Sequence, residues 1–137
     1  MLPEGLASQV ADVVGQLHAR YTGVVADHLD GTGVTAAQFI ALVVLQAFPA
    51  GLTQAAWGRH QGVSRQRAHR VARELRELGF VAVRRRGRAS TVALTEAGVV
   101  FLSAHGPAID AELARRMPQR EAAVRQALEQ LAVLLQP

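Results

Sequence analysis

The spacing of apolar residues is helical along most of this chain and changes once, to the alternation typical of a β-strand. The change falls after Gly79, where apolar residues alternate with others over residues 81–84 and again over residues 92–94. The 137 residues suit one domain with an added oligomerisation element. The pattern therefore predicts a mainly α fold with one small β-hairpin, an α+β class.

Helix boundaries are marked by capping and breaking residues. The periodicity predicts helices over residues 6–29, 36–48, 54–60, 65–78, 96–117 and 118–136. Thr35, Thr53 and Ser64 stand where an N-cap hydroxyl accepts a backbone hydrogen bond. Pro49 is expected to stop the second helix, and Pro107 to bend or break the fifth because it has no N–H to donate.

The predicted hairpin has a cationic tip, Arg85-Arg86-Gly87-Arg88. A tight turn at Arg86-Gly87 would pair Arg85 with Arg88 and Val81 with Val92. Arginines held this close together repel one another, so the tip favours an anionic partner.

Positive charge is concentrated in the middle of the chain. Residues 52–98 hold ten arginines and three acidic residues, whereas the rest holds five arginines and eight acidic residues. A basic middle between acidic flanks indicates a nucleic acid or another acidic surface as partner. Cysteine and lysine are both absent, which excludes disulfides, thiolate metal sites, thiol redox switches and Schiff-base lysines.

The helix expected over residues 65–78 separates an apolar face from a basic one. At about 100° per residue, Ala68, Val71, Ala72 and Leu75 fall on one side. Gln66, His69, Arg70 and Arg73 fall on the opposite side, where the arginines can hold guanine or phosphate and the amide can read adenine. A short helix, a glycine turn, a capped basic helix and a basic hairpin, in this order, predict a winged helix-turn-helix that binds duplex DNA. The predicted DNA contacts are Ser64, Arg65, Gln66, Arg67, His69, Arg70, Arg73, Arg84, Arg85, Arg86 and Arg88.

Five short stretches carry a resemblance to a known family. They are Val34–Phe39 (VTAAQF), Leu52–Ala55 (LTQA), Gly62–Arg65 (GVSR), Leu75–Val81 (LRELGFV) and Leu94–Gly98 (LTEAG). Their order and spacing resemble the MarR family of bacterial transcription regulators over essentially the whole chain, although each stretch alone recurs widely in helix-turn-helix proteins.

The resemblance implies a dimeric repressor or activator. An N-terminal dimerisation helix would occupy residues 1–34, the DNA-binding region residues 35–98 and the C-terminal dimerisation helices residues 99–137. It further implies that small anionic aromatic ligands often relieve DNA binding, from a cavity whose candidate lining is His18, Tyr21, Phe39 and Val43.

Three features depart from the family pattern. The wing is shorter than usual, and Trp57 replaces a typical aliphatic core residue. Arg88 matches the arginine of the family's Asp-x-Arg wing motif, but Arg86 stands in place of the aspartate that would brace it. These departures bear on the geometry of the wing and leave the fold unchanged.

Other functions find less support in the sequence. The five histidines show no metal-ligand spacing, no cofactor motif occurs, and the carboxylates of the basic helix suit salt bridges better than catalysis, so an enzyme is not expected. No signal peptide or membrane span is recognised, which predicts a cytoplasmic protein. The main alternative is a winged-helix protein-interaction module, such as an antirepressor, without specific DNA binding.

Overall fold

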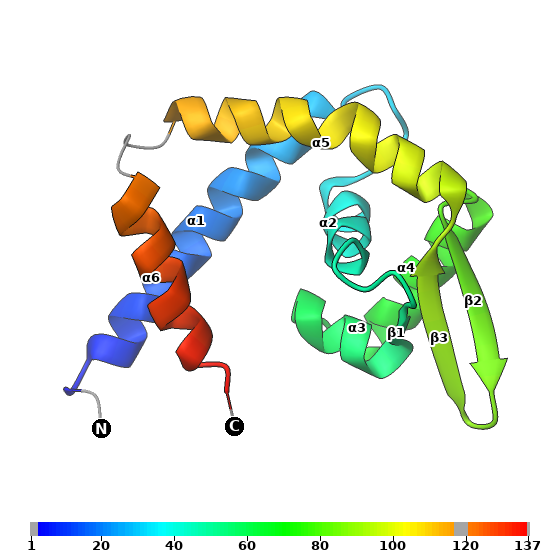
Figure 1. The fold of residues 1–137 in the computed structure, drawn as a ribbon, viewed down its shortest axis with the longest axis horizontal. Helices are drawn as coiled ribbons and strands as arrows, with labels where there is room; N and C mark the ends of the chain where they lie inside the picture. The colour runs from blue at the N-terminus through cyan, green and yellow to red at the C-terminus, as the bar shows by residue number, and fades with distance from the viewer. Residues whose placement is uncertain (1–2, 117–120, 137) are drawn as a thin grey trace.

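In the computed structural model, residues 3–116 and 121–136 are described, and this part of the chain holds six helices and three short strands (Figure 1). The elements are α1 (Leu6–His28), α2 (Ala36–Leu45), β1 (Leu52–Thr53), α3 (Gln54–Gln61), α4 (Arg65–Glu77), β2 (Val81–Arg86), β3 (Ala89–Leu94), α5 (Glu96–Arg116) and α6 (Glu121–Val133). The mainly α fold with a small β wing is confirmed. No helix within the described ranges is long and apolar enough to cross a membrane.

The predicted N-caps are confirmed. Thr35 and Gln38 form a capping box at the start of α2, since the Thr35 hydroxyl accepts from the Gln38 N–H and the Gln38 side chain accepts from the Thr35 N–H. The hydroxyls of Thr53 and Ser64 accept backbone hydrogen bonds at the starts of α3 and α4. Each cap satisfies an N–H group that the first helical turn leaves unpaired.

The expected end of the second helix is wrong by three residues. α2 stops at Leu45, and the chain continues in tight turns in which Gln46 N–H donates to the Val43 carbonyl and Phe48 N–H to the Leu45 carbonyl. These i→i−3 bonds tighten the backbone before Pro49, so the proline ends a turn that follows the helix.

The three strands form an antiparallel sheet in the order β1-β3-β2. The predicted hairpin register is wrong, because the two-residue turn is Gly87-Arg88 and Val83 pairs with Val92. In the predicted register Val83 would have faced Ser90, whereas the observed one sets apolar residues opposite each other on the core face. Gly87 takes the first turn position with φ of +60°, a conformation that glycine adopts without strain.

The core lies where α2, α3, α4 and the sheet meet α5. Trp57 is fully buried there, and its indole N–H donates to the Ala41 carbonyl of α2 at 2.8 Å. This bond ties α3 to α2, so the unusual tryptophan is a core residue. By contrast, α6 contributes no buried residue, and α1 buries only Val24 and Val25 near its C-terminal end.

Helix α5 passes through Pro107 without a break. It joins the wing to the end of the molecule that carries α1 and α6, and it changes direction along its length (Figure 1). The alternative of two separate helices is therefore wrong. Pro118, expected in the first turn of the last helix, lies outside the described residues.

Candidate nucleic-acid interface

Helices α3 and α4 form the helix-turn-helix pair. Gly62 adopts φ of +70° in the turn between them, and Ser64 then caps α4. The two helices approach closely at Gly58, where an added Cβ would lie 3.1 Å from the Ala68 Cβ. Ala68 and Leu75 are fully covered, which fixes the inner face of α4 against the core.

The outer face of α4 carries the residues that the sequence predicts to touch DNA. The predicted residues of this segment are all exposed: Ser64, Arg65, Gln66, Arg67, His69, Arg70 and Arg73. Gln54 of α3 approaches the His69 ring at 3.4 Å. Arg73 and Glu77, four positions apart on α4, form no ion pair in the described part of the chain.

Glu74 connects α4 to α2. Its carboxylate accepts a hydrogen bond of 3.0 Å from the side-chain amide of Gln38, which is itself 9% exposed. The same Gln38 closes the capping box of α2. One buried amide therefore fixes the start of α2 and the orientation of α4 together.

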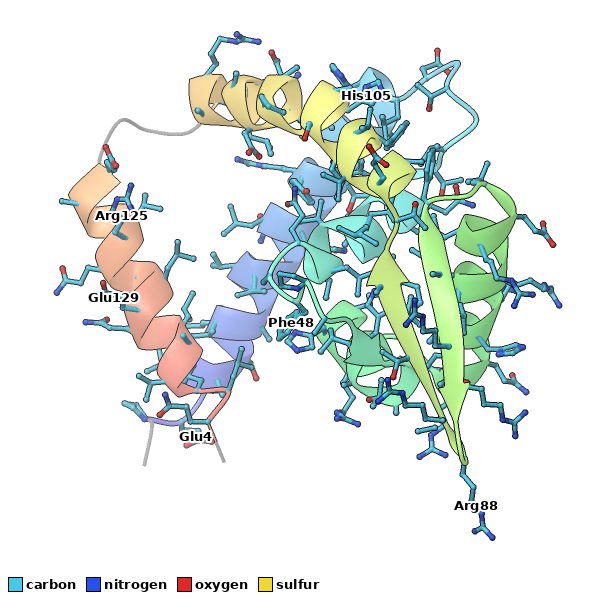
Figure 2. All side chains as sticks on the ribbon, turned by 45° about the vertical axis from the view of Figure 1, so that its right-hand side comes forward. Glu4, Phe48, Arg88, His105, Arg125 and Glu129 are labelled. Atoms are coloured by element: carbon cyan, nitrogen blue, oxygen red, sulfur yellow. The ribbon has the colours of Figure 1, made fainter. Side chains whose placement is uncertain are left out.

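The wing extends beyond the body of the protein and carries exposed arginines to its tip, where Arg88 points outward (Figure 2). Arg84 and Arg86 lie on one face of β2, whereas Arg85 lies on the opposite face, opposite Ser90. The Arg85 Nε donates to the Gly87 carbonyl at 3.4 Å. The four arginines that the sequence predicts as contacts thus point in different directions from one narrow support.

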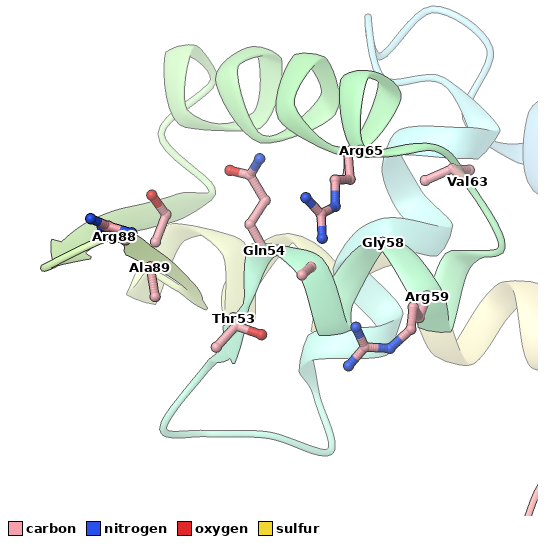
Figure 3. A pocket seen from close by; sticks show the side chains of 11 residues that line it. Thr53, Gln54, Gly58, Arg59, Val63, Arg65, Arg88 and Ala89 are labelled. Carbon is pink, nitrogen blue, oxygen red and sulfur yellow. The ribbon is translucent and has the colours of Figure 1, made fainter.

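A hollow of about 630 Å³ lies between α3, the start of α4 and the wing turn (Figure 3). Arg59 of α3, Arg65 of α4 and Arg88 of the wing turn border it, beside Thr53 and Gln54 at the start of α3. Arg59 was not among the predicted contacts, because it lies on the helix before α4. Its membership of the basic segment 52–98 was the sequence signal that could have found it.

The arginines of this surface are not neutralised within the chain. In residues 3–116 and 121–136 the ion pairs join Glu112 to Arg115 and Arg116, and Glu121 to Arg125. Hydrogen bonds from Arg115 and Arg116 lower the pKa of Glu112. No arginine between residues 59 and 88 takes part in an ion pair of the described residues, so ten guanidinium groups are available to an anionic partner.

A second cavity, of about 310 Å³, lies between α1, α2 and α5. Its lining residues are Tyr21, Phe39, Val43, Gln46, Leu102, Ser103, Gly106, Pro107 and Asp110. His18, the fourth residue predicted for the lining, is exposed elsewhere on α1. Burial, and secondly the negative charge of Asp110, raise the pKa of the Tyr21 hydroxyl.

No group of three or more histidine, aspartate or glutamate side chains that could hold a metal ion occurs in the part of the chain that the structure describes. His28 and His105 contact each other edge to face, with ring centroids 5.6 Å apart. His105 also packs on Phe101, at a centroid distance of 4.5 Å. These two histidines are part of an aromatic cluster between α1 and α5.

The winged segment matches a family of known proteins. Residues 32–89, from the turn before α2 to the first residue of β3, match the model of the MarR family. The resemblance to the MarR family is confirmed. No curated protein sequence is significantly similar to this chain.

Solved MarR structures share the fold of nearly the whole chain. A MarR-family transcriptional regulator from Rhodococcus sp. RHA1 is 20% identical with a TM-score of 0.79, and the match covers 96% of each chain. CouR from Rhodococcus jostii RHA1, bound to p-coumaroyl-CoA, has the same identity and TM-score over 98% of this chain and 97% of its own. BpsR from Bordetella bronchiseptica is 17% identical with a TM-score of 0.71, over 90% and 98%.

The wing shows how this chain departs from the MarR pattern. Arg86, in place of the motif's aspartate, is the last residue of β2 and pairs with Ala89 across the turn. Arg88 forms no ion pair with any described residue and instead lines the hollow beside α3. The substitution removes the aspartate that would pair with Arg88 and adds a positive charge in its place.

Proposed function

We propose that this chain is a homodimeric, sequence-specific DNA-binding regulator of transcription, a repressor acting in the bacterial cytoplasm. The observation that carries the proposal is the set of ten unpaired arginines on the winged segment. Exposed arginines of α4, the wing and the hollow lie on neighbouring elements. Duplex DNA presents phosphates along a similarly extended surface and explains why the chain leaves so much positive charge unneutralised.

In this proposal α4 enters the major groove. Thirteen residues give it a length of about 20 Å, which suits one helix lying in the groove. Arg70 and Gln66 on its outer face would contact base edges. The wing tip would reach the adjacent minor groove, and the three arginines of the hollow would hold phosphates between them.

The dimer would form through α1, α5 and α6. These helices carry apolar side chains that the single chain leaves exposed: Val13 (55%), Leu17 (48%), Leu128 (62%) and Val133 (58%) are examples. A helix of 13 residues such as α6 is marginally stable without packing partners. A second copy of the chain would cover these side chains and place two copies of α4 about one DNA turn, ~34 Å, apart.

Release by a small organic ligand is the third part of the proposal. The cavity between α1, α2 and α5 adjoins α2, whose Gln38 holds α4 through Glu74. Two proteins of the same fold support ligand-dependent release: CouR binds p-coumaroyl-CoA, and 6-hydroxynicotinic acid regulates DNA binding of BpsR. A ligand that displaces α2 would change the orientation of α4 and lower its affinity for DNA.

The experiment is selection of DNA fragments by the purified protein, followed by a gel shift on the enriched sequence and on a scrambled one. We expect a pseudo-palindromic site that is bound with at least about 1,000-fold preference, the lower end of the discrimination of specific DNA-binding proteins. Enrichment of no sequence, together with capture of another regulator, would instead support the antirepressor alternative.

A further inference from the structure

The cavity between α1, α2 and α5 has an apolar floor and a polar rim. Phe39 and Leu102, of which no more than 2% is exposed, form its floor. Hydroxyl, amide and carboxylate groups come to its edge from Tyr21 of α1, Gln46 directly after α2 and Asp110 of α5. A volume of about 310 Å³ is at the lower end of small-molecule sites, so it suits a compound with a single ring.

The charge of this rim is negative. Asp110 is the only ionisable group of the lining apart from Tyr21, and no arginine or histidine of the described residues belongs to that lining. Arg115 and Arg116, further along α5, line a separate hollow and are both bonded to Glu112. Asp110 itself has no hydrogen-bond or ion-pair partner among the described side chains.

An anionic ligand is therefore poorly matched to this site. Its carboxylate would stand beside that of Asp110, and two like charges at a few ångströms repel each other even at a partly exposed rim. Burial, and secondly the negative charge of Asp110, raise the pKa of the neighbouring Tyr21 hydroxyl. A cationic group at the rim would be attracted by the carboxylate, while an aromatic ring could pack on Phe39.

We propose that the cavity binds a small aromatic amine, with its ammonium group at Asp110 and its ring on the floor formed by Phe39 and Leu102. This inference rests on the proposed function, since it names the ligand class of the same regulator. It reverses the charge of the aromatic acids that the MarR resemblance implies. The physical reason is local: the rim supplies one carboxylate and no cation.

The test uses two probes that share a phenol ring and a two-carbon spacer and carry opposite charges, tyramine and 3-(4-hydroxyphenyl)propionate, titrated calorimetrically into the protein in low-salt buffer at pH 7. We expect tyramine to bind at least about tenfold more tightly, the size of effect that a charge a few ångströms away produces at a partly exposed site. In Asp110→Asn this preference should disappear. The matched control Glu96→Gln, an acid-to-amide change at the far end of the same helix, should retain it.

A cavity-filling variant, Ser103→Phe, locates the bound probe, because it adds a ring to the lining and should abolish tyramine binding. Equal or tighter binding of the acid, a preference that survives Asp110→Asn, or no binding of either probe would overturn the proposal. These titrations contain no DNA, so failure of the proposed DNA binding would appear separately, in the gel shift with the selected fragment.

Discussion

At the scale of single residues, the surface of α4 depends on the chemistry of arginine. The chain contains no lysine, so apart from its histidines every basic side chain carries a planar guanidinium that can hold a phosphate or a guanine edge through two hydrogen bonds. Arg70 and Gln66 are both exposed on α4, on the side away from the buried Ala68 and Leu75. Their side chains can therefore be removed while the core packing stays intact.

Arg70→Ala and Gln66→Ala should each weaken binding to the selected DNA site by about 1–3 kcal/mol, because each removes a hydrogen bond to a base edge and leaves the core unchanged. Gel-shift titration measures the affinity, and light scattering checks that the oligomeric state is unchanged. Arg20→Ala is the matched control, since it removes the same charge from an exposed position on α1. Wild-type affinity in both α4 variants would mean that another face of the protein contacts the base edges.

At the scale of elements, the wing is fastened to α5 at its base. The Thr95 hydroxyl donates to the Gly79 carbonyl at 2.6 Å, and the Thr95 N–H donates to the Phe80 carbonyl at 3.0 Å. The same hydroxyl accepts from the Gly98 N–H and so caps the start of α5. Gly98 lies against the Phe80 backbone with no room for a side chain.

Gly98→Ala should lower the free energy of unfolding by about 1–3 kcal/mol, because its Cβ would overlap the Phe80 carbonyl oxygen and force α5 away from the wing. Gly23→Ala, at an exposed position within α1, is the matched control. An added Cβ there meets nothing within 4 Å, so helix propensity predicts a gain of up to about 1 kcal/mol. Urea unfolding followed by circular dichroism measures both; equal effects of the two changes would contradict the close approach.

The wing should add general affinity more than sequence choice, since its arginines lie on a narrow hairpin and face in several directions. Arg86→Ala combined with Arg88→Ala should weaken specific and nonspecific DNA binding alike. It should also flatten the dependence of log K on log[salt] by about one unit for each phosphate that the shortened side chains no longer neutralise.

The control for the wing variant is Arg115→Ala combined with Arg116→Ala. It changes the net charge equally, but both arginines are bonded to Glu112 on α5. Fluorescence anisotropy at a series of salt concentrations gives the slopes. A wild-type slope in the wing variant would mean that the hairpin points away from DNA.

At the scale of the whole molecule, the winged segment forms a closed core, whereas α1 and α6 do not. Figure 1 shows these two helices at the end of the molecule away from the wing. Apolar residues of α6 and of the segment that follows it remain exposed: Leu128 and Val133 in the helix, and Leu134 and Leu135 after it, are examples. Exposed apolar stripes of this kind mark surfaces that pack against another chain.

Leu128→Glu combined with Leu131→Glu should shift the protein from dimer to monomer at micromolar concentration, because two charges would have to be buried in the interface. DNA affinity should fall as well, since one copy of α4 occupies only one half-site. Gln130→Glu, on the opposite side of α6, adds the same kind of charge and should leave the dimer intact. Light scattering measures the oligomeric state, and a monomeric wild-type protein would contradict the proposed interface.

The amino-acid sequence by itself determined the local structure. Thr35, Thr53 and Ser64 cap their helices as predicted, and α4 buries the predicted side, because caps and helical faces depend on residues only a few positions apart. The change of period after Gly79 likewise located the hairpin. The match of residues 32–89 to the MarR family has the same origin, since it rests on these local patterns.

The tertiary structure decided what depends on neighbours distant in sequence. The hairpin register followed from packing Val83 opposite Val92 and from the pairing of β3 with β1, a strand that the periodicity did not predict. Arg59 joins the hollow, and His18 stays out of the cavity, because helices far apart in the chain meet at particular angles. Such angles are set by the packing of the whole core, with Trp57 bonded to α2 and Gln38 to α4, and no short stretch of sequence contains them.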